Sequence, residues 1–323
     1  MSKLITKFRN LLIEKSNQNL SELASHIGIS RVTLYSLMYD NWKQIQRETI
    51  EKVCDYFNCE INDLFAIEEN PFWLPFLQKG DFCFIYGGTK VNENKDVVGF
   101  WDIKVMSEVT THLNKLCGKD PVNFSFISTL DFGDSMEKVI DFIKMNNTII
   151  IGSPKNNVLT EYVLAKLYKA EPFNPEKKNR DKIPMRFVRP KNWGISTEKS
   201  TVSNFGDQKN MRGVFSHKSN KIIAYGDWFD NFYNRQVELG KDCAILVVVN
   251  KPFETAANVK LIILAGFTGL SSYGAAQLLI KHSNNLEPAT SKPLVKAIQL
   301  QYKKLTLDKD DREITKISFV QEK

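Results

Sequence analysis

The sequence has few of the features that mark membrane and secreted proteins. Its longest apolar runs, residues 148–152 and 243–249, have the length of a strand, whereas a membrane-spanning helix needs about 20 apolar residues. The first ten residues, MSKLITKFRN, lack the apolar core of a signal peptide. These absences predict a cytoplasmic protein that does not enter a membrane.

Cysteine and histidine are scarce, with five and four residues among 323. No two cysteines form a Cys-x-x-Cys pair, and no histidine lies at ligand spacing from a cysteine, so a zinc site has no support. An odd number of dispersed cysteines is typical of free thiols in a reducing compartment. We therefore expect neither a metal ion nor a cofactor.

The most informative stretch is residues 19–64, NLSELASHIGISRVTLYSLMYDNWKQIQRETIEKVCDYFNCEINDL. Asn19 is placed to cap a helix, with Glu22 three residues later as its capping partner. Gly28 then offers a left-handed turn, and Ser30 is placed to cap the next helix, residues 31–39. Two short capped helices around a glycine turn are typical of a helix-turn-helix, whose second helix enters the major groove.

The second helix has distinct inward and outward residues. Leu34 and Leu37 share the inward face. The residues expected to point outward are Arg31, Val32, Thr33, Tyr35 and Ser36. An arginine suits guanine O6 and N7, while a valine or a threonine methyl group suits a thymine methyl group. The alternative is a small helical bundle that binds protein or only dimerises.

Residues 5–66 resemble the lambda-repressor-like (XRE-type) DNA-binding domain. The matching segments are ELASHIGISRVTLYSL and ETIEKVCDYFNCEINDLF. The resemblance implies an all-helical domain over residues 1–66 that binds double-stranded DNA. It further implies base contacts from Arg31, Val32 and Ser36, with Thr33 nearby.

The chain departs from the family pattern at two places. Leu20 stands where many members have glutamine, and residues 38–41, MYDN, replace the usual Glu-x-Gly-Lys. Lys43 follows this segment and is included among the expected DNA contacts. Residues 1–66 hold eight Lys/Arg and eight Asp/Glu, so we expect weak binding by one copy and a dimer on paired half-sites.

Residues 67–80 are expected to connect two domains. Pro71 and Pro75 interrupt any helix, but Phe72, Trp73 and Phe76 are too apolar for a free tether. This segment is therefore expected to dock on a domain or on a second subunit.

From residue 81 on, predicted strands alternate with predicted helices. The strands are residues 81–86, 123–130, 147–152, 221–225, 242–250, 260–265, 297–305 and 314–321, and the helices are residues 100–117, 135–145, 157–168 and 272–281. This alternation predicts a three-layer α/β domain over residues 81–323 with a mostly parallel sheet, the last two strands forming an antiparallel edge.

Three of the predicted strands end in loops of glycine and short polar residues. These residues are Gly87, Gly88, Gly152, Ser153, Asn156, Asn157, Gly266, Thr268 and Ser271. Open α/β sheets bind ligands at the carboxyl ends of their strands, so the loops predict a site for a nucleotide-like small molecule. None is a Walker or a dinucleotide-binding loop, and tight turns with helix caps explain each of them without a ligand.

The segment IIIGSPKNNVLTEY also resembles the nucleoside deoxyribosyltransferase-like fold. That resemblance implies Glu161 as the nucleophile or as the stabiliser of an oxocarbenium-like sugar, assisted by Asp102 or Asp131. The alternative is that Glu161 is a first-turn helix residue favoured by the helix dipole.

The positive charge is concentrated in residues 166–221, which hold 14 Lys/Arg against five Asp/Glu. One interpretation is a solvated, mobile insertion. The other is a phosphate-binding surface, on which Trp193, Phe205 and Phe215 stack on bases.

The leading hypothesis is a dimeric, sequence-specific transcriptional regulator of the repressor type, whose α/β domain senses a ligand or mediates assembly. The rival is a nucleoside- or nucleotide-directed N-glycosidase that carries a DNA-binding head. A third interpretation is a defence or phage-repressor component whose α/β domain only binds protein.

Overall fold

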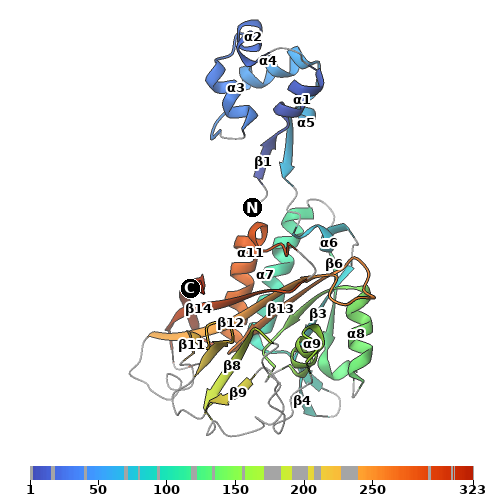
Figure 1. The fold of residues 1–323 in the computed structure, drawn as a ribbon, viewed down its shortest axis with the longest axis vertical. Coiled ribbons are helices and arrows are strands. Elements are labelled where there is room, and N and C mark those ends of the chain that lie inside the picture. Colours follow the sequence, from blue (N-terminus) through green and yellow to red (C-terminus); the bar gives the residue numbers. More distant parts are fainter. Residues whose placement is uncertain are drawn as a thin grey trace. The chain divides into compact units, whose positions relative to one another are not determined.

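The computed structural model divides the chain into two compact units, Met1–Asn70 and Pro71–Lys323 (Figure 1). It describes residues 3–15, 19–39, 42–68, 72–78, 81–92, 95–117, 122–132, 135–154, 157–170, 183–190, 203–206, 212–226, 239–289, 292–306, 308 and 310–322. Each unit has its own hydrophobic core, so each is considered by itself.

The N-terminal unit is a five-helix bundle closed by a two-stranded sheet. Its elements are β1 (Lys3–Thr6), α1 (Phe8–Lys15), α2 (Leu20–Ile27), α3 (Arg31–Met38), α4 (Arg47–Phe57), α5 (Ile61–Leu64) and β2 (Phe65–Glu68). Strand β1 pairs antiparallel with β2, so the two ends of the unit meet. This pairing was not expected from the sequence, because two strands of four residues give little periodicity.

The expected helix caps are present. The Asn19 side chain accepts from the backbone N–H groups of Ser21 and Glu22, each at 3.0 Å, and the Glu22 carboxylate accepts from the Asn19 N–H at 3.3 Å. Gly28 ends α2 with a φ of +65°. Ser30 Oγ accepts from the Thr33 N–H at 3.0 Å and so caps α3. Residues close in sequence therefore define the start of α2 at Asn19, its end at Gly28 and the start of α3 at Ser30.

The second unit is built on a seven-stranded sheet of order β15-β14-β12-β13-β7-β3-β6. Its strands are β3 (Asp81–Tyr86), β6 (Asn123–Ser128), β7 (Asn147–Ile151), β12 (Leu239–Asn250), β13 (Lys260–Gly266), β14 (Leu294–Lys304) and β15 (Arg312–Phe319). Its helices are α6 (Leu74–Gln78), α7 (Phe100–Cys117), α8 (Met136–Met145), α9 (Val158–Leu167) and α11 (Gly269–His282), with the short 3₁₀ helices η1 (Thr129–Phe132) and η3 (Ser283–Asn285). Strands β4 (Thr89–Asn92) and β5 (Lys95–Val97) form a separate hairpin.

The expectation of a mostly parallel sheet is wrong. Strands β13, β7, β3 and β6 are parallel, but β12, β14 and β15 join them through antiparallel pairs. Only residues 251–259 connect β12 to β13, and they contain no helix. A parallel pair needs a crossover of about a dozen residues or more, so this short connection imposes an antiparallel pair.

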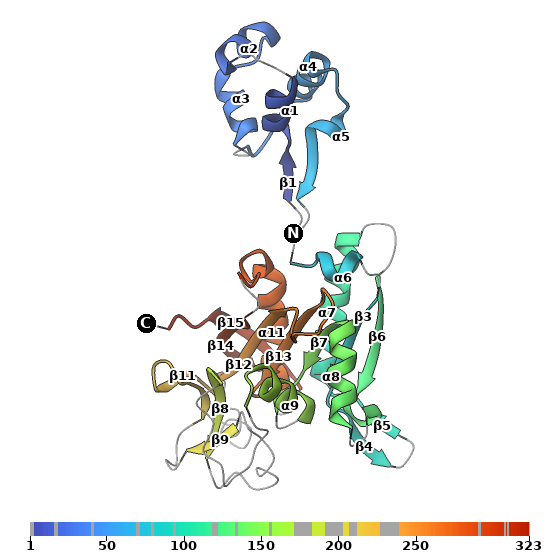
Figure 2. The same ribbon diagram turned by 45° about the vertical axis from the view of Figure 1, so that its right-hand side comes forward.

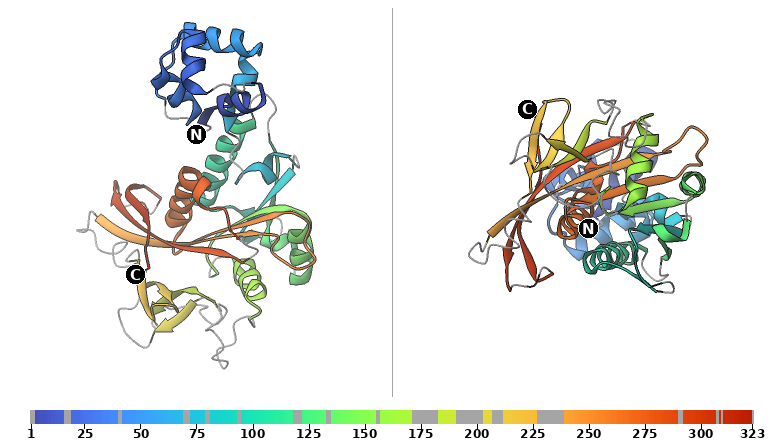
Figure 3. Two further views of the ribbon diagram at one scale, coloured as in Figure 1. Left: turned by 45° about the horizontal axis from the view of Figure 1, so that its top comes forward. Right: turned by 90° about the horizontal axis from the view of Figure 1, so that it is seen from below.

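The sheet is the middle of three layers. Helices α6, α7 and α11 cover one face, where Phe84, Val109 and Leu279 belong to one apolar cluster (Figures 2 and 3). Helices α8 and α9 cover the other face through a second cluster. Every residue of β7 and β13 is buried, which explains why Ile149–Ile151 and Leu261–Ala265 are apolar without alternation.

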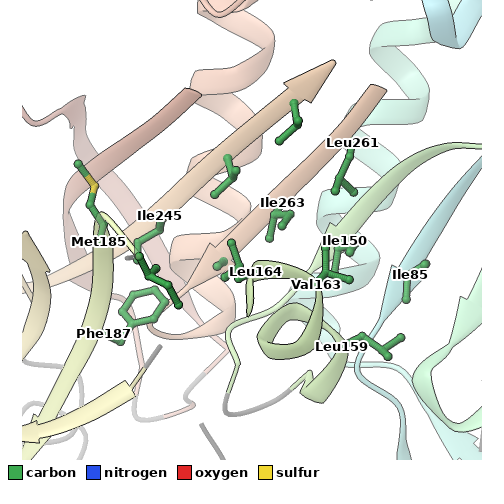
Figure 4. Packing of buried hydrophobic residues seen from close by; sticks show 14 of the residues in the cluster. Ile85, Ile150, Leu159, Val163, Leu164, Met185, Phe187, Ile245, Leu261 and Ile263 are labelled. Atoms are coloured by element: carbon green, nitrogen blue, oxygen red, sulfur yellow. The ribbon is translucent and has the colours of Figure 1, made fainter. Parts of the chain in front are cut away.

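A second sheet, of order β11-β10-β8-β9, packs beside α9 on that face. It comprises β8 (Met185–Pro190), β9 (Ser203–Gly206), β10 (Gly213–Ser216) and β11 (Lys221–Tyr225). Met185 and Phe187 of β8 lie against Ile245 of the large sheet (Figure 4). The described part of residues 166–221 is therefore not a solvated insertion, because its apolar residues complete the core.

Residues 67–80 divide between the two units. Ile67 and Glu68 pair with β1 in the N-terminal unit. Phe72, Trp73 and Phe76 are fully buried in the core of the second unit, around α6. The short stretch at Asn70 and Pro71 is thus where the chain passes from one unit to the other.

Candidate nucleic-acid interface

Helix α3 has one anchored face and one exposed face. Leu34 and Leu37 are buried in the core of the N-terminal unit. Val32 is 75% exposed, and Arg31 beside it is also exposed. Tyr35 and Tyr39 are also exposed, at 39% and 61%, and exposed apolar side chains that gather on one surface mark interaction sites.

A row of three side chains extends along the exposed face of α3. The Arg31 guanidinium lies 5.5 Å from the centre of the Tyr35 ring. The Tyr35 ring in turn stacks on that of Tyr39, with centroids 5.9 Å apart and planes at 9°. Tyr39 was not among the expected contacts, although its spacing of four residues from Tyr35 placed both on one face. The row presents the Arg31 guanidinium on the exposed face of α3, where no carboxylate of the described residues pairs with it.

The hydroxyls of Thr33 and Ser36 are engaged within the helix. Thr33 Oγ1 lies 2.8 Å from Ser30 Oγ, the group that caps α3. Ser36 Oγ donates to the Val32 carbonyl at 3.0 Å. Both residues are half-buried. Thr33 therefore supports the cap, whereas Ser36 keeps lone pairs that can accept from a base.

The cations of α4 are already paired on their own helix. Arg47 contacts Glu51 and Lys52 contacts Glu48, each at 2.7 Å. The hydrogen bond from Lys52 lowers the pKa of Glu48 below its ordinary value. Lys43 is exposed and, among the described residues, lies in no ion pair. Together with Arg31 it is the cation closest in sequence to α3 that is available for phosphates.

The three glycine loops of the second unit lie at the end of the large sheet where its parallel strands have their C-termini. They follow β3, β7 and β13, which are parallel neighbours. Asn156 lies outside the described residues. The topology thus brings together the described loop residues Gly87 and Gly88, Gly152, Ser153 and Asn157, and Gly266 to Ser271.

Most polar groups of these loops hold the loops themselves. The Asn157 side chain donates to the Ile151 carbonyl at 2.8 Å and accepts from the Leu159 N–H at 3.0 Å. Ser271 Oγ accepts from the Thr268 N–H at 3.1 Å and so caps α11. These side chains explain the strand-to-helix turns without a ligand.

Glycine is required in these loops for packing. A Cβ on Gly266 would lie 2.2 Å from the Thr268 carbonyl oxygen, and one on Gly88 would lie 2.2 Å from Ser128 Oγ. Gly152 has a φ of +106°, which L residues rarely adopt. Ser153 Oγ is buried and has no hydrogen-bond partner among the described residues.

The three carboxylates of the alternative enzymatic interpretation do not form a cluster. Glu161 is only 3% exposed on α9, and Asp102 belongs to α7, on the opposite face of the sheet. Asp131 is exposed and accepts from the Ser128 N–H at 2.8 Å. Burial raises the pKa of Asp102 to about 6.

The described residues include no group of three side chains arranged to hold a metal ion. None of the described helices combines the length and the apolar character that a membrane span needs.

Residues 7–70 match the family model of the Cro/C1-type HTH DNA-binding domain. The N-terminal unit is a helix-turn-helix DNA-binding domain. The expected resemblance to the XRE type is confirmed for this unit. No curated protein and no solved structure matches the chain, so the resemblance of the second unit to nucleoside deoxyribosyltransferases has no support.

Proposed function

We propose that the protein is a sequence-specific transcriptional regulator that reads duplex DNA with the exposed face of α3. The observation that carries the proposal is the pairing of Arg31 with the 75% exposed Val32 on a helix whose other face is anchored by Leu34 and Leu37. Arginine matches the two acceptors of guanine, and valine matches the thymine methyl group. Ser36 and Tyr35 extend the same face, and Lys43 contacts the phosphate backbone.

Residues 1–66 carry eight Lys/Arg and eight Asp/Glu, and Glu68 and Glu69 add two more negative charges to the unit Met1–Asn70, so its attraction to DNA as a single copy is weak. A dimer on two half-sites doubles the phosphate contacts and adds specificity. We therefore assign the second unit the role of assembling two copies and of sensing a small, nucleotide-like ligand at the loop edge, where Ser153 supplies a free hydroxyl. This unit would regulate DNA binding if the ligand binds more tightly to one arrangement of the two DNA-binding domains than to the other.

The DNA proposal is tested by selecting the preferred duplex from a random pool and measuring affinity by fluorescence anisotropy at several salt concentrations. Arg31→Ala is expected to weaken binding about tenfold to a hundredfold and to relax the preference at one base pair, because a bidentate contact contributes about 1–3 kcal/mol.

Arg9→Ala is the matched control, since it removes the same charge from α1 of the same domain. It is expected to weaken binding equally for all sequences or to leave it unchanged. If Arg31→Ala keeps both the affinity and the base preference, α3 is not the reading helix. The sensor role is checked by mass spectrometry of small molecules released from the purified protein and by thermal shift with ATP, adenosine and NAD; no released compound and no shift would refute it.

A further inference from the structure

Strand β6 forms an edge of the large sheet that lacks the usual protection. Among the described strands it pairs only with β3, and Figure 2 shows it at the outer side of the sheet. Its sequence, NFSFIS, contains no charge and no proline, and its register with β3 has no bulge. Charged residues, prolines and bulges are the features that prevent the free edges of natural sheets from pairing with other strands.

An apolar groove extends from this edge toward α7. It has a volume of about 480 Å³ and is lined by Tyr86, Val98, Ile103, Met106, Ser107, Thr110, Thr111, Phe124 and Phe126. None of these residues is charged. Phe126 is 52% exposed and Ile103 is 54% exposed, so large apolar side chains are in contact with water at the edge.

We propose that a second copy of this chain docks on this surface, β6 against β6, so that the two large sheets continue into one another. The strand itself favours this occupant, because an edge without charge, proline or bulge pairs with a copy of itself without burying a charge. The net charge of +7 on each copy opposes association, so the contact is expected at a place that carries no charge of its own. A twofold interface is also self-complementary, which an uncharged apolar surface satisfies without an opposite charge.

The geometry of β6 fixes the register of the contact. A twofold axis perpendicular to the sheet makes the two β6 strands antiparallel and keeps the α7 faces on the same side. With the axis at Ser125, Phe124 of each copy lies opposite Phe126 of the other. The contact therefore contains two Phe124–Phe126 pairs. Moving the axis to Phe126 would place Phe124 opposite Ser128, which is buried and accepts from the Leu130 N–H in the following turn.

This inference rests on the proposed function in one respect, since it provides the dimer that paired half-sites require. It names the surface, the symmetry and the register of that dimer. Its test measures assembly without DNA, so it can fail or succeed independently of the reading by α3.

The test is sedimentation velocity of the full chain at micromolar concentrations. The wild type is expected to be a dimer, and Phe126→Lys is expected to raise the dimer dissociation constant at least tenfold, because it places two like charges in an apolar contact. Met145→Lys is the matched control, since Met145 is 63% exposed on α8, away from the groove. It is expected to leave the dimer unchanged.

A cross-link tests the register without altering an aromatic ring. Residues directly opposite in an antiparallel pair have Cα atoms about 4.5–5.5 Å apart, within the range of a disulfide. Ser125→Cys is therefore expected to give a covalent dimer on mild oxidation. Asn123→Cys is its control, because the two copies of that residue would be roughly 14 Å apart along the strands.

A monomeric wild type would overturn the inference and would leave the groove to another occupant, such as a small apolar molecule. A dimer that resists Phe126→Lys and gives no Ser125→Cys cross-link would also overturn it, because the copies would then meet elsewhere. Loss of DNA binding in Arg31→Ala together with an intact dimer supports both proposals. A Phe126→Lys variant that keeps its preference for a single half-site but no longer binds paired half-sites cooperatively supports them as well.

Discussion

Substitution of Lys260 tests how the segment around α6, residues 72–78, is held on the large sheet. Lys260 lies at the start of β13 and is 1% exposed. Its ammonium donates to the Phe72 carbonyl at 2.7 Å and to the Glu287 carboxylate at 2.6 Å, and it lies 4.2 Å from the centre of the Phe72 ring. Asn147 of the neighbouring strand donates to the Pro75 carbonyl at 2.6 Å. Lys260 at the start of β13 and Asn147 at the start of β7 therefore hold the segment around α6 by hydrogen bonds to its backbone.

The two members of the ion pair have unequal surroundings. Glu287 has a side chain that is 38% exposed and also accepts from Asn250 at 2.6 Å, so it remains hydrated without Lys260. Lys260 has no such access to water. Burial lowers its pKa, and Glu287 offsets part of that effect.

Removing Glu287, the more exposed partner, is therefore expected to lower the free energy of unfolding by more than removing the buried Lys260. Lys260→Met leaves the Phe72 carbonyl without this donor, which costs about 2 kcal/mol of unfolding free energy. Glu287→Ala leaves a buried ammonium without its counter-charge, which costs about 3–4 kcal/mol. The assay is urea unfolding at pH 7, followed by tryptophan fluorescence. Lys281→Met, at an exposed lysine of α11, is expected to change stability little.

The pH dependence gives an independent check. In Glu287→Ala the folded-state pKa of Lys260 lies further below its ordinary value of 10.5. The penalty is therefore full at pH values below that folded pKa and disappears as the pH rises toward 10.5, because the neutral amine has no charge to bury. A larger loss for Lys260→Met than for Glu287→Ala, or a loss that is the same at pH 7 and pH 10, would refute this reasoning.

Further predictions concern three positions, Asp102, Gly28 and Gly266. Burial raises the pKa of Asp102 from 3.8 to about 6, so its contribution to stability is largest at low pH and is lost as the pH rises through 6. Asp102→Asn should therefore stabilise the second unit at pH 7.5 but not at pH 4. The expected gain in unfolding free energy is about 1–2 kcal/mol, because partial exposure of the carboxylate reduces the effect of burial. Urea titrations at both pH values check this, and an equal effect at the two would contradict it. Gly28→Ala should cost about 1 kcal/mol, because no atom lies within 4 Å of the added Cβ and only its φ of +65° is strained. Gly266→Ala should cost about 3 kcal/mol, because the added Cβ would lie 2.2 Å from the Thr268 carbonyl oxygen and 2.3 Å from the Ser272 backbone nitrogen. Thermal unfolding followed by circular dichroism compares the two glycine variants. Similar losses of stability would argue against the packing role of Gly266.

Much of the DNA-binding domain could be predicted because its signals are local. The Asn19–Glu22 capping box, the turn at Gly28 and the Ser30 cap each connect residues no more than three positions apart. The limits of α7 follow in the same way from the spacing of its apolar residues. Arg31 and Val32 are exposed as expected, whereas the Thr33 hydroxyl lies against Ser30, which caps the helix; the contacts of these residues with DNA stay a prediction.

The amino-acid sequence by itself determined the helix-turn-helix, helices α7, α8, α9 and α11 and the strands of the large sheet, because helix caps and apolar periodicity act over a few residues. The short strands β1, β2, β4, β5, β8, β9 and β10 were not expected from it. Only the tertiary structure decided which strands are parallel, that the glycine loops lie at the same end of the large sheet, and that β6 pairs with β3 alone among the described strands. The physical reason is that these features depend on which strands become neighbours. Lys260 and the Phe72 carbonyl are 188 positions apart, and no local pattern relates them before the sheet forms.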